Sequence, residues 1–294
     1  MYPHWGRFIA DQKENFQTVS DAAQFFLVCR CGMDVAVAPL AAGKLAAAYL
    51  WDSCKKIYAF DEDLAQVLRD QAAEAVNSGA VPVETLRAFP APGAYIKAAD
   101  VIEAGLDGFF VWREDRAGKG YLQIAFLNSQ MSFVTAAAVE ISSDGGLEAS
   151  LPDPDAWLYP YIVAAARHDE DALQTVLHYR EMGGPAVYRI HNWLLRALQM
   201  ILYLCCDNAD IRKEHDVSPE GTEIGADSGP VEKITVGTLV GSEIRKAARD
   251  NPEGKTRKAH TRKGHWHSYW TGPKNGERKR ITRWVAPVFV GSRI

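Results

Sequence analysis

The sequence predicts an α+β protein in which helices pack on an antiparallel meander and a basic β-hairpin closes the chain. The Ala- and Leu-rich first third predicts helices, the middle predicts three short apolar strands, and the aromatic C-terminal segment alternates like a pair of strands. The chain has 294 residues, of which 47% are hydrophobic and 24% are charged. This composition is typical of a globular protein with one large domain or two smaller ones.

The first predicted helices begin near residue 40. The segment "LAAGKLAAAYLWDSCKKIYAF" is rich in Ala and Leu, and "DEDLAQVLRDQAAEAV" follows it with Asp61 placed to cap a helix. Apolar side chains recur at the helical period in the second segment, at Leu64, Val67, Leu68, Ala72 and Ala75. We therefore expect the first third of the chain to be helical.

Three short strands are predicted in the middle of the chain. They are "GFFVWRE" at 108–114, "YLQIAFL" at 121–127 and "FVTAAAVEIS" at 133–142. Because the connections between them are short and turn-like, we expect the three strands to pair in sequence order in the antiparallel direction. This arrangement is a meander. Their dense apolar content indicates a sheet with at least one covered face, and the helices supply the cover.

More helix is predicted after the meander. Residues 156–206 contain two helical stretches separated by "EMGGP". The second stretch is predicted to lie at the centre of the core, because one face is apolar at Val187, Ile190, Leu194, Ala197, Ile201 and Leu204. Further along, "EKITVGTLV" predicts a strand and "GSEIRKAARD" a short helix.

The predicted domain organisation follows the charge. We predict an acidic helical and meander body at 1–206, an acidic linker or loop at 207–230 and a basic strand, helix and hairpin module at 231–294. Residues 241–294 carry 14 Lys and Arg against four acids, or +10, which leaves −14 for the preceding residues of a chain with net charge −4. Such a split is expected where a basic face meets a polyanion such as RNA, or an acidic partner. In the alternative interpretation, the basic segment neutralises the acidic body of its own chain.

The sequence predicts a cytoplasmic protein that makes no contact with a membrane. The longest apolar run, at 193–206, is interrupted by Arg196 and Gln199 and is shorter than the roughly 20 residues that a membrane helix needs. The first residues lack the cationic start and apolar stretch of a secretory signal. Five cysteines, an odd number, form no disulfide framework, which fits a reducing compartment.

The C-terminal segment "RKGHWHSYWTG" contains the strongest candidates for functional side chains in the sequence. If 264–271 is a strand, alternation separates its aromatic residues into two faces. One face carries His265, His267 and Tyr269, and the other carries Trp266, Ser268 and Trp270. The partner strand is predicted at 278–290, after a turn in "PKNGE" that contains Asn-Gly.

Two chemical interpretations of this hairpin rest on its histidines. As a metal site, His265 and His267 would be ligands with His260 as a third, but the surrounding Lys and Arg repel a cation, so we predict no metal and no cofactor. As a metal-independent ribonuclease, His265 and His267 would act as general base and acid. Arg262 or Lys263 would then stabilise the phosphorane.

Two other interpretations of the hairpin involve neither catalysis nor metal binding. In nucleic-acid binding, exposed aromatic rings at Trp266, Tyr269 or Trp270 stack on bases. The phosphates would then meet a basic set of six residues: Lys258, Arg262, Lys263, Arg278, Lys279 and Arg280. In a purely structural interpretation, the tryptophans pack on the core and the basic residues form a solvated edge.

"HTRKGHWHSYWTG" followed by "RKRITRWVAPVFVG" resembles the C-terminal signature of the type V-A anti-CRISPR family whose members lower production of the RNA-guided type V-A effector nuclease. The matching positions are His260, Arg262 with Lys263, Gly264 to His267, Tyr269 with Trp270, Gly272, Arg283 with Trp284, Pro287, and Phe289 with Val290. Lys263 departs from the Arg that is commoner in the family, and a bidentate phosphate contact there would be lost. Looser similarity extends upstream through most of the chain.

The resemblance implies a non-enzymatic adaptor of a mobile genetic element. Its partner would be the N-terminal peptide of the type V-A nuclease, recognised on the translating ribosome, with loss of the nuclease mRNA and protein; RNA is a second expected partner. The residues we predict for binding are Lys258, His260, Arg262, Lys263, His265, Trp266, His267, Tyr269, Trp270, Arg278, Lys279, Arg280, Arg283 and Trp284. The alternatives that stay open are an RNA-binding protein and a ribonuclease using His265 and His267.

Overall fold

The structure is a computed structural model, and its described residues fall into two compact units. Unit 1 comprises Met1–Cys54, Ala91–Tyr95 and Phe109–Leu194, and unit 2 comprises Lys55–Pro90, Ile96–Gly108 and Leu195–Ile294. The described residues are 8, 15–33, 38–72, 83–89, 93–116, 119–130, 133–141, 147–148, 185–213, 231–250, 260–262, 264–273 and 276–290. The predicted helix between 156 and 184 lies outside them, as does most of the predicted linker.

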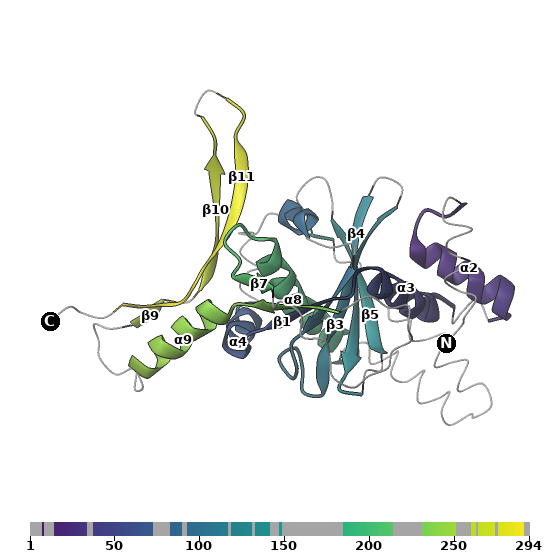
Figure 1. Ribbon diagram of the computed structural model, residues 1–294, viewed down its shortest axis with the longest axis horizontal. Helices are drawn as coiled ribbons and strands as arrows, with labels where there is room; N and C mark the ends of the chain where they lie inside the picture. The colour runs from purple at the N-terminus through teal and green to yellow at the C-terminus, as the bar shows by residue number, and fades with distance from the viewer. Residues whose placement is uncertain are drawn as a thin grey trace. The chain divides into compact units, whose positions relative to one another are not determined.

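Unit 1 begins with two packed helices, α2 (Val19–Cys31) and α3 (Ala38–Cys54) (Figure 1). Thr18 caps α2, because its hydroxyl oxygen accepts a hydrogen bond from the Asp21 backbone N–H at 3.0 Å. The helix ends at Gly32, whose φ of 67° suits a glycine at this position. The predicted helical N-terminal third is therefore confirmed for these residues.

The meander of unit 1 consists of consecutive strands that are neighbours in one sheet. The strands are β3 (Leu106–Arg116), β4 (Lys119–Asn128), β5 (Phe133–Ile141) and β6 (Leu147–Glu148). The β4–β5 and β5–β6 pairs are antiparallel, as the short connections predicted. Aromatic rings pack together in this unit: the Phe126 ring lies 5.8 Å from Phe109 and 5.6 Å from Trp193.

Glu114 on β3 is a buried carboxylate that joins three elements of unit 1. Its Oε1 atom accepts hydrogen bonds from the Ser20 N–H at 3.2 Å, the Ser20 hydroxyl at 2.6 Å and Trp112 Nε1 at 3.2 Å. Its Oε2 atom accepts one from Gln123 Nε2 at 3.3 Å. The start of α2 is therefore attached to the meander by polar contacts as well as by packing.

Unit 2 contains a mixed group of strands rather than a purely antiparallel one. β1 (Lys56–Phe60) pairs in parallel with β8 (Glu232–Val236), and β7 (Ile211–Lys213) pairs with β8 in the antiparallel direction. The prediction of helix through residue 60 was wrong, because α3 ends at Cys54 and "KIYAF" is β1. The β-strand is selected by pairing with residues about 175 positions away, such as Tyr58 with Ile234, and local composition does not encode that partner.

Three helices surround these strands. α4 (Glu62–Asp70) starts after Asp61, which caps it as predicted, and α8 (Pro185–Cys205) is the long apolar helix predicted for the core. Its residues Leu194, Ala197 and Ile201 are fully buried. α9 (Thr238–Asp250) begins three residues earlier than predicted, because Gly237 adopts a φ of 80° and ends β8. The shorter elements are η2 (Val83–Ala88) and β2 (Gly93–Lys97).

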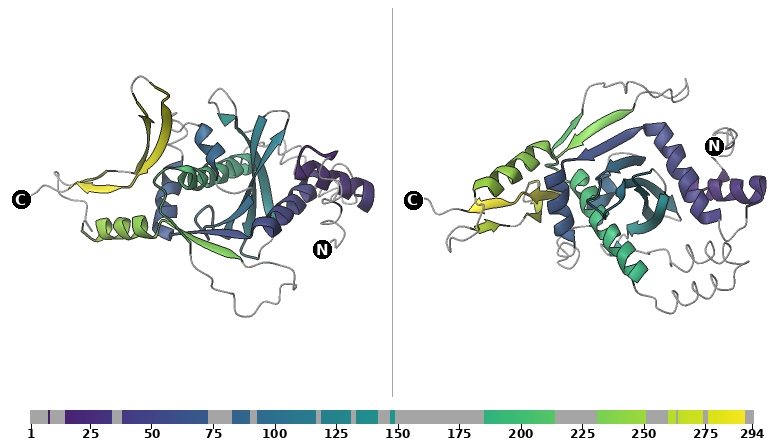
Figure 2. Two further views of the ribbon diagram at one scale, coloured as in Figure 1. Left: turned by 45° about the horizontal axis from the view of Figure 1, so that its top comes forward. Right: turned by 90° about the horizontal axis from the view of Figure 1, so that it is seen from below.

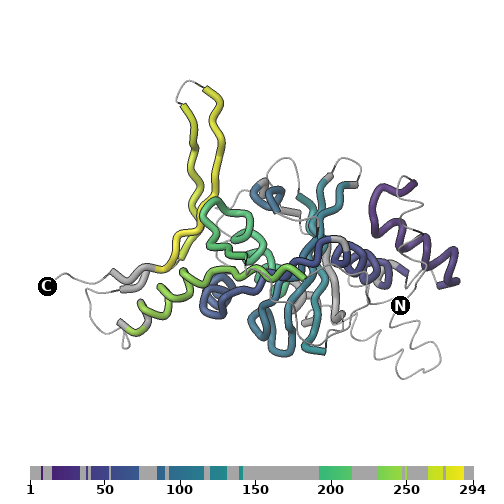
Figure 3. Tube along the Cα trace, viewed as in Figure 1, coloured from purple at the N-terminus to yellow at the C-terminus, as the bar shows by residue number. Residues whose placement is uncertain are grey.

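The C-terminal hairpin of unit 2 is formed by β10 (His265–Thr271) and β11 (Lys279–Val285), paired in the antiparallel direction. Figure 3 shows these two strands as a two-stranded ribbon that projects away from α8. The predicted second strand, 278–290, is interrupted at 286–287, where Pro287 removes a backbone donor. β12 (Val288–Val290) then pairs with β9 (His260–Arg262), a strand that the sequence did not predict, and both lie beside α9 (Figures 1 and 2).

The α+β fold class and the terminal hairpin are thus confirmed, with a sheet that is mixed. None of the described helices has the combination of length and apolar composition that a bilayer crossing requires. The division at 206 and 230 stays a prediction. Residues 211–213 of the predicted linker form β7.

Candidate functional site

Two tryptophans anchor the base of the C-terminal hairpin. Trp266 on β10 and Trp284 on β11 are directly opposite each other in the register, and they are only 6% and 2% exposed. Trp266 Nε1 donates to Gln199 Oε1 at 2.8 Å, and Trp284 Nε1 donates to Gln71 Oε1 at 3.2 Å. Each buried indole N–H therefore has an acceptor, which removes the penalty for burying it.

Asn208, just after α8, holds the β11 side of this base. Its Nδ2 donates to the Trp284 carbonyl oxygen at 2.8 Å, and its Oδ1 accepts from the Trp284 N–H at 3.0 Å. The side-chain amide thus makes the pair of hydrogen bonds that a neighbouring strand would make. The Trp284 ring also packs edge-on against Tyr203 at 5.6 Å.

Gly264 allows this close approach at the start of β10. A Cβ atom at this position would lie 2.8 Å from Gln71 Nε2 and 2.8 Å from Trp284 Cζ2, which is closer than real Cβ atoms come to such neighbours. A glycine before the strand is therefore required by packing. The Gly-His-Trp part of the sequence signature accordingly has a structural role at its first and third positions.

The opposite face of the hairpin is open to solvent. His265, His267 and Tyr269 share this face, as strand alternation predicted, and all three are exposed. The His267 and Tyr269 rings are 4.2 Å apart and tilted by 34°. Arg283, which is also exposed, is the register partner of His267, so this face combines two aromatic rings with a cation.

Trp270 behaves differently from Trp266, although both lie on the same strand face. Trp270 is 60% exposed and has Arg280 as its register partner. Arg278 and Lys279 are also exposed at this end of the hairpin, together with the acidic residue Glu277. The far end of the hairpin therefore presents an indole among cations.

The predicted binding residues consequently divide into three groups. His265, His267, Tyr269, Trp270, Arg278, Lys279, Arg280 and Arg283 are exposed on the hairpin. Trp266 and Trp284 are buried anchors, so base stacking by Trp266 does not fit its position. His260 and Arg262 belong to β9, whose side chains lie outside the description, as do Lys258 and Lys263.

The residues that position the hairpin were not predicted from the sequence. Gln71, Gln199 and Asn208 come from three separate places in the chain and meet only at the two tryptophans. One signal was available: Gln199 interrupts the apolar run "WLLRALQMILYLCC", and a buried polar side chain requires a partner. Among the described residues, no group of three His, Cys, Asp or Glu side chains gathers as metal ligands.

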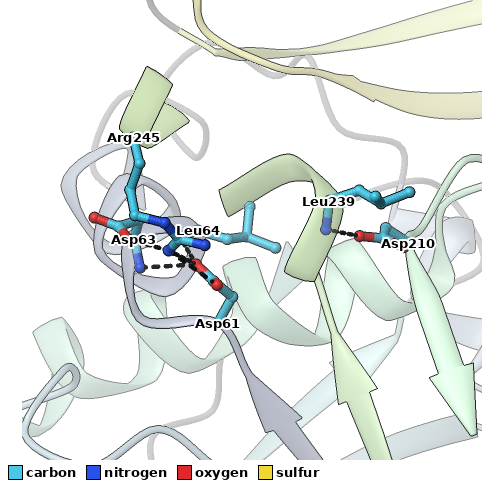
Figure 4. Close-up of polar contacts among 6 residues, drawn as sticks. All are labelled: Asp61, Asp63, Leu64, Asp210, Leu239 and Arg245. Atoms are coloured by element: carbon cyan, nitrogen blue, oxygen red, sulfur yellow. Dashed lines mark hydrogen bonds and ion pairs between the residues drawn. The ribbon is translucent and has the colours of Figure 1, made fainter. Parts of the chain in front are cut away.

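A polar cluster holds α9 against α4 in the same unit (Figure 4). The Asp61 carboxylate accepts from the backbone N–H groups of Asp63 and Leu64, and Arg245 Nη1 donates to it and to Asp63. The hydrogen bonds to Asp63 and to Asp61 raise the pKa of Arg245. A side chain at Gly241 would clash with the Asp61 carboxylate, so α9 approaches as closely as a glycine permits.

The start of α9 has a second polar contact, shown in the same close-up. The Leu239 N–H at the first turn donates to Asp210 Oδ2 at 2.6 Å, so Asp210 satisfies one of the free donors of this helix (Figure 4). α9 therefore has polar contacts at Leu239 in its first turn and at Arg245 further along.

Comparison with known proteins places this architecture in a family. The model of the AcrVA2-like family, described as anti-CRISPR type V subtype A2, matches residues 58–292, which include the hairpin and both of its anchors. The chain belongs to the AcrVA2-like family.

A solved structure has the same fold as this AcrVA2-like chain. The crystal structure of AcrVA2 matches it with a TM-score of 0.55 and 17% sequence identity, over 98% of this chain and 92% of that one. No curated protein sequence matches the chain. The family confirms the resemblance to type V-A anti-CRISPR proteins, and the identity of 17% supports the shared fold only.

Proposed function

We propose that this AcrVA2-like chain lowers the amount of a type V-A CRISPR nuclease by recognising the N-terminal peptide of that nuclease during translation. Loss of the nuclease mRNA and protein follows from this recognition. The observation that carries the proposal is the match to the type V-A anti-CRISPR family over residues 58–292. The chain acts as an adaptor in the bacterial cytoplasm rather than as an enzyme.

One edge of unit 2 suits an extended peptide. β7 is the last strand of the series β1, β8, β7, so its outer edge pairs with no strand among the described residues. Its three residues are exposed, including Ile211 at 38%. A peptide that adds to such an edge gains backbone hydrogen bonds, and its alternate side chains provide the selectivity.

The test is co-expression with a type V-A nuclease whose first codons are recoded in two ways. Synonymous recoding changes the nucleotides and keeps the peptide, whereas a compensated frameshift keeps most nucleotides and changes the peptide. We expect the chain to lower mRNA and protein of the synonymous version and to spare the frameshifted one, as measured by quantitative PCR and immunoblotting. Unchanged levels of the unmodified nuclease would contradict the proposal.

The ribonuclease alternative has a separate test with purified protein. If the chain cut RNA without a partner, and if both H265A and H267A abolished cutting while the fold was retained, an enzymatic function would replace the adaptor function. A preparation that leaves RNA intact supports the adaptor. Leu239→Ala, at an exposed position of α9 outside the hairpin, is the control variant because it removes a side chain that cannot transfer a proton.

A further inference from the structure

We propose that the tip of the hairpin binds single-stranded nucleic acid. We define the hairpin tip as Trp270, Thr271 and Arg278–Arg280. In this proposal Trp270 stacks on an unpaired base, Arg280 contacts a phosphate on the same face, and Lys279 contacts the nucleic acid from the opposite face. The inference goes beyond the proposed function, which requires only peptide recognition, and it can fail without affecting it.

The exposure of Trp270 has no explanation in packing. At 60% it is more exposed than the other large hydrophobic side chains found at the described surface, such as Leu239 at 54%. On the same strand face, Trp266 is 6% exposed and hydrogen-bonded. An indole usually contributes to a protein by burying its large apolar surface, so an exposed one on a rigid strand is available for a ligand.

The cations around Trp270 are not neutralised within the described part of the chain. Arg278, Lys279 and Arg280 are exposed, and none of them forms an ion pair with a described carboxylate. Elsewhere in unit 2 the arginines at positions 69, 196, 212 and 245 each have an acidic partner. The positive charge at the hairpin tip is therefore left for an external polyanion.

The register places charge and ring side by side. Arg280 is directly opposite Trp270, and Lys279 is directly opposite Thr271. Cross-strand neighbours of this kind have Cβ atoms about 5 Å apart. By strand alternation Arg280 shares the face of Trp270, whereas Lys279 lies on the opposite face. A base stacked on the indole would thus have a phosphate within reach of Arg280, and a strand that passes over the end of the hairpin would meet Lys279 on its other face.

The other face of the hairpin repeats the combination closer to the base. The paired rings of His267 and Tyr269 lie beside Arg283. Aromatic rings alternating with cations along a strand suit a flexible single strand, because each nucleotide offers one ring face and one charge. A duplex keeps its bases stacked inside and would leave the indole without a partner.

The anchors make the proposal testable by mutation. Trp266, Trp284 and their acceptors fix the base of the hairpin, and Trp270 contributes nothing to that buried cluster. Trp270→Ala should therefore leave the fold intact. The matched control is Leu239→Ala, which removes another exposed apolar side chain, at the start of α9.

The experiment measures fluorescence anisotropy of a labelled 20-nucleotide oligouridine with the purified full-length chain. We expect W270A to weaken binding about tenfold, W270F to retain most of the affinity, and L239A to bind like the parent. An oligodeoxythymidine of the same length tells whether the site distinguishes RNA from DNA, since the stacking and phosphate contacts are common to both.

Charge is tested by the salt dependence of the same binding. The triple variant R278A/K279A/R280A should lower the slope of log affinity against log salt by about 2, because about 0.7 counterions are released per phosphate contact of a single strand. The triple variant K97A/K246A/R249A removes the same charge from exposed positions outside the hairpin and should change the slope much less.

Three results would overturn the proposal. They are equal affinity of W270A and the parent, equal losses in the two triple variants, and tighter binding of polyglutamate than of oligouridine. The last result would identify the hairpin tip as a surface for an acidic protein. The peptide-dependent loss of nuclease mRNA in cells is read out separately, so failure here and failure of the proposed function are distinguishable.

Discussion

Arg245 Nη1 on α9 lies 3.1 Å from both carboxylate oxygens of Asp61, the residue that caps α4. One carboxylate therefore begins one helix and holds another. The two residues are 184 positions apart, and the contact brings together the parts of unit 2 that follow β1 and β8.

Replacing Asp61 should cost more than the loss of a helix cap. Asp61→Ala removes the acceptor for the Asp63 and Leu64 N–H groups, which is worth about 1 kcal/mol, and it also leaves Arg245 with fewer partners. We expect a larger loss of unfolding free energy than for Arg245→Ala, as measured by urea denaturation. Arg69→Ala, which removes an exposed pair with the adjacent Asp70, serves as the control. Equal stability of D61A and the parent would contradict a dual role.

Tryptophan-to-alanine substitutions at the two ends of the hairpin should differ strongly in their effect on the unfolding free energy. Trp284→Ala empties a buried position and leaves Gln71 Oε1 without its donor, so we expect a loss of about 3–5 kcal/mol in unfolding free energy. Trp270→Ala should change it by less than about 0.5 kcal/mol, because the side chain is exposed. Chemical denaturation of both variants checks the difference. Similar losses would mean that the tip is part of the core.

Glu114 should not tolerate its amide analogue. Its three hydrogen-bonding neighbours in unit 1 provide four donor groups, and a Gln side chain would turn an N–H₂ group toward some of them. We expect Glu114→Gln to reduce the unfolding free energy by about 2 kcal/mol. Hydrogen exchange should show the earliest loss of protection in α2, whose first turn contains Ser20. Glu243→Gln, at an exposed position, is the control, and equal effects of the two variants would argue against the donor arrangement.

The adjacent thiols at the end of α8 should be unreactive. Burial raises the pKa of Cys205 to about 12 and that of Cys206 to about 11. A raised pKa keeps a thiol protonated at neutral pH, and at pH 8 only about one Cys206 thiol in 1,000 would be ionised. We expect iodoacetamide to modify the exposed Cys29 and Cys31 first, as followed by peptide mass spectrometry. Rapid labelling of Cys205 or Cys206 in the folded chain would contradict this burial.

Local pattern predicted those features whose cause is local. Asp61 was identified as a cap because a cap depends on the next three residues, and α8 was identified as a core helix because its apolar face is periodic. Strand alternation likewise separated the histidines of the hairpin from its tryptophans. The family was recognised from the C-terminal signature, which is a matter of sequence alone.

Other features depended on partners that are distant in the chain. "KIYAF" became a strand because β8 pairs with it, and β9 formed where β12 returned beside it. Both pairings overrode what the surrounding residues favoured. Neither could be predicted from local composition, because strand pairing is decided by which segments meet in space.

The same distinction decides the candidate site. The sequence by itself determined that Trp266 and Trp270 share a face of β10, that cations are concentrated in the last 54 residues and that the chain resembles a type V-A anti-CRISPR family. Only the tertiary structure decided that Trp266 is an anchor and Trp270 is exposed. The physical reason is that alternation specifies the direction of a side chain, whereas burial depends on the atoms it meets there. Trp266 donates a hydrogen bond to Gln199 of α8, whereas Trp270 is 60% exposed.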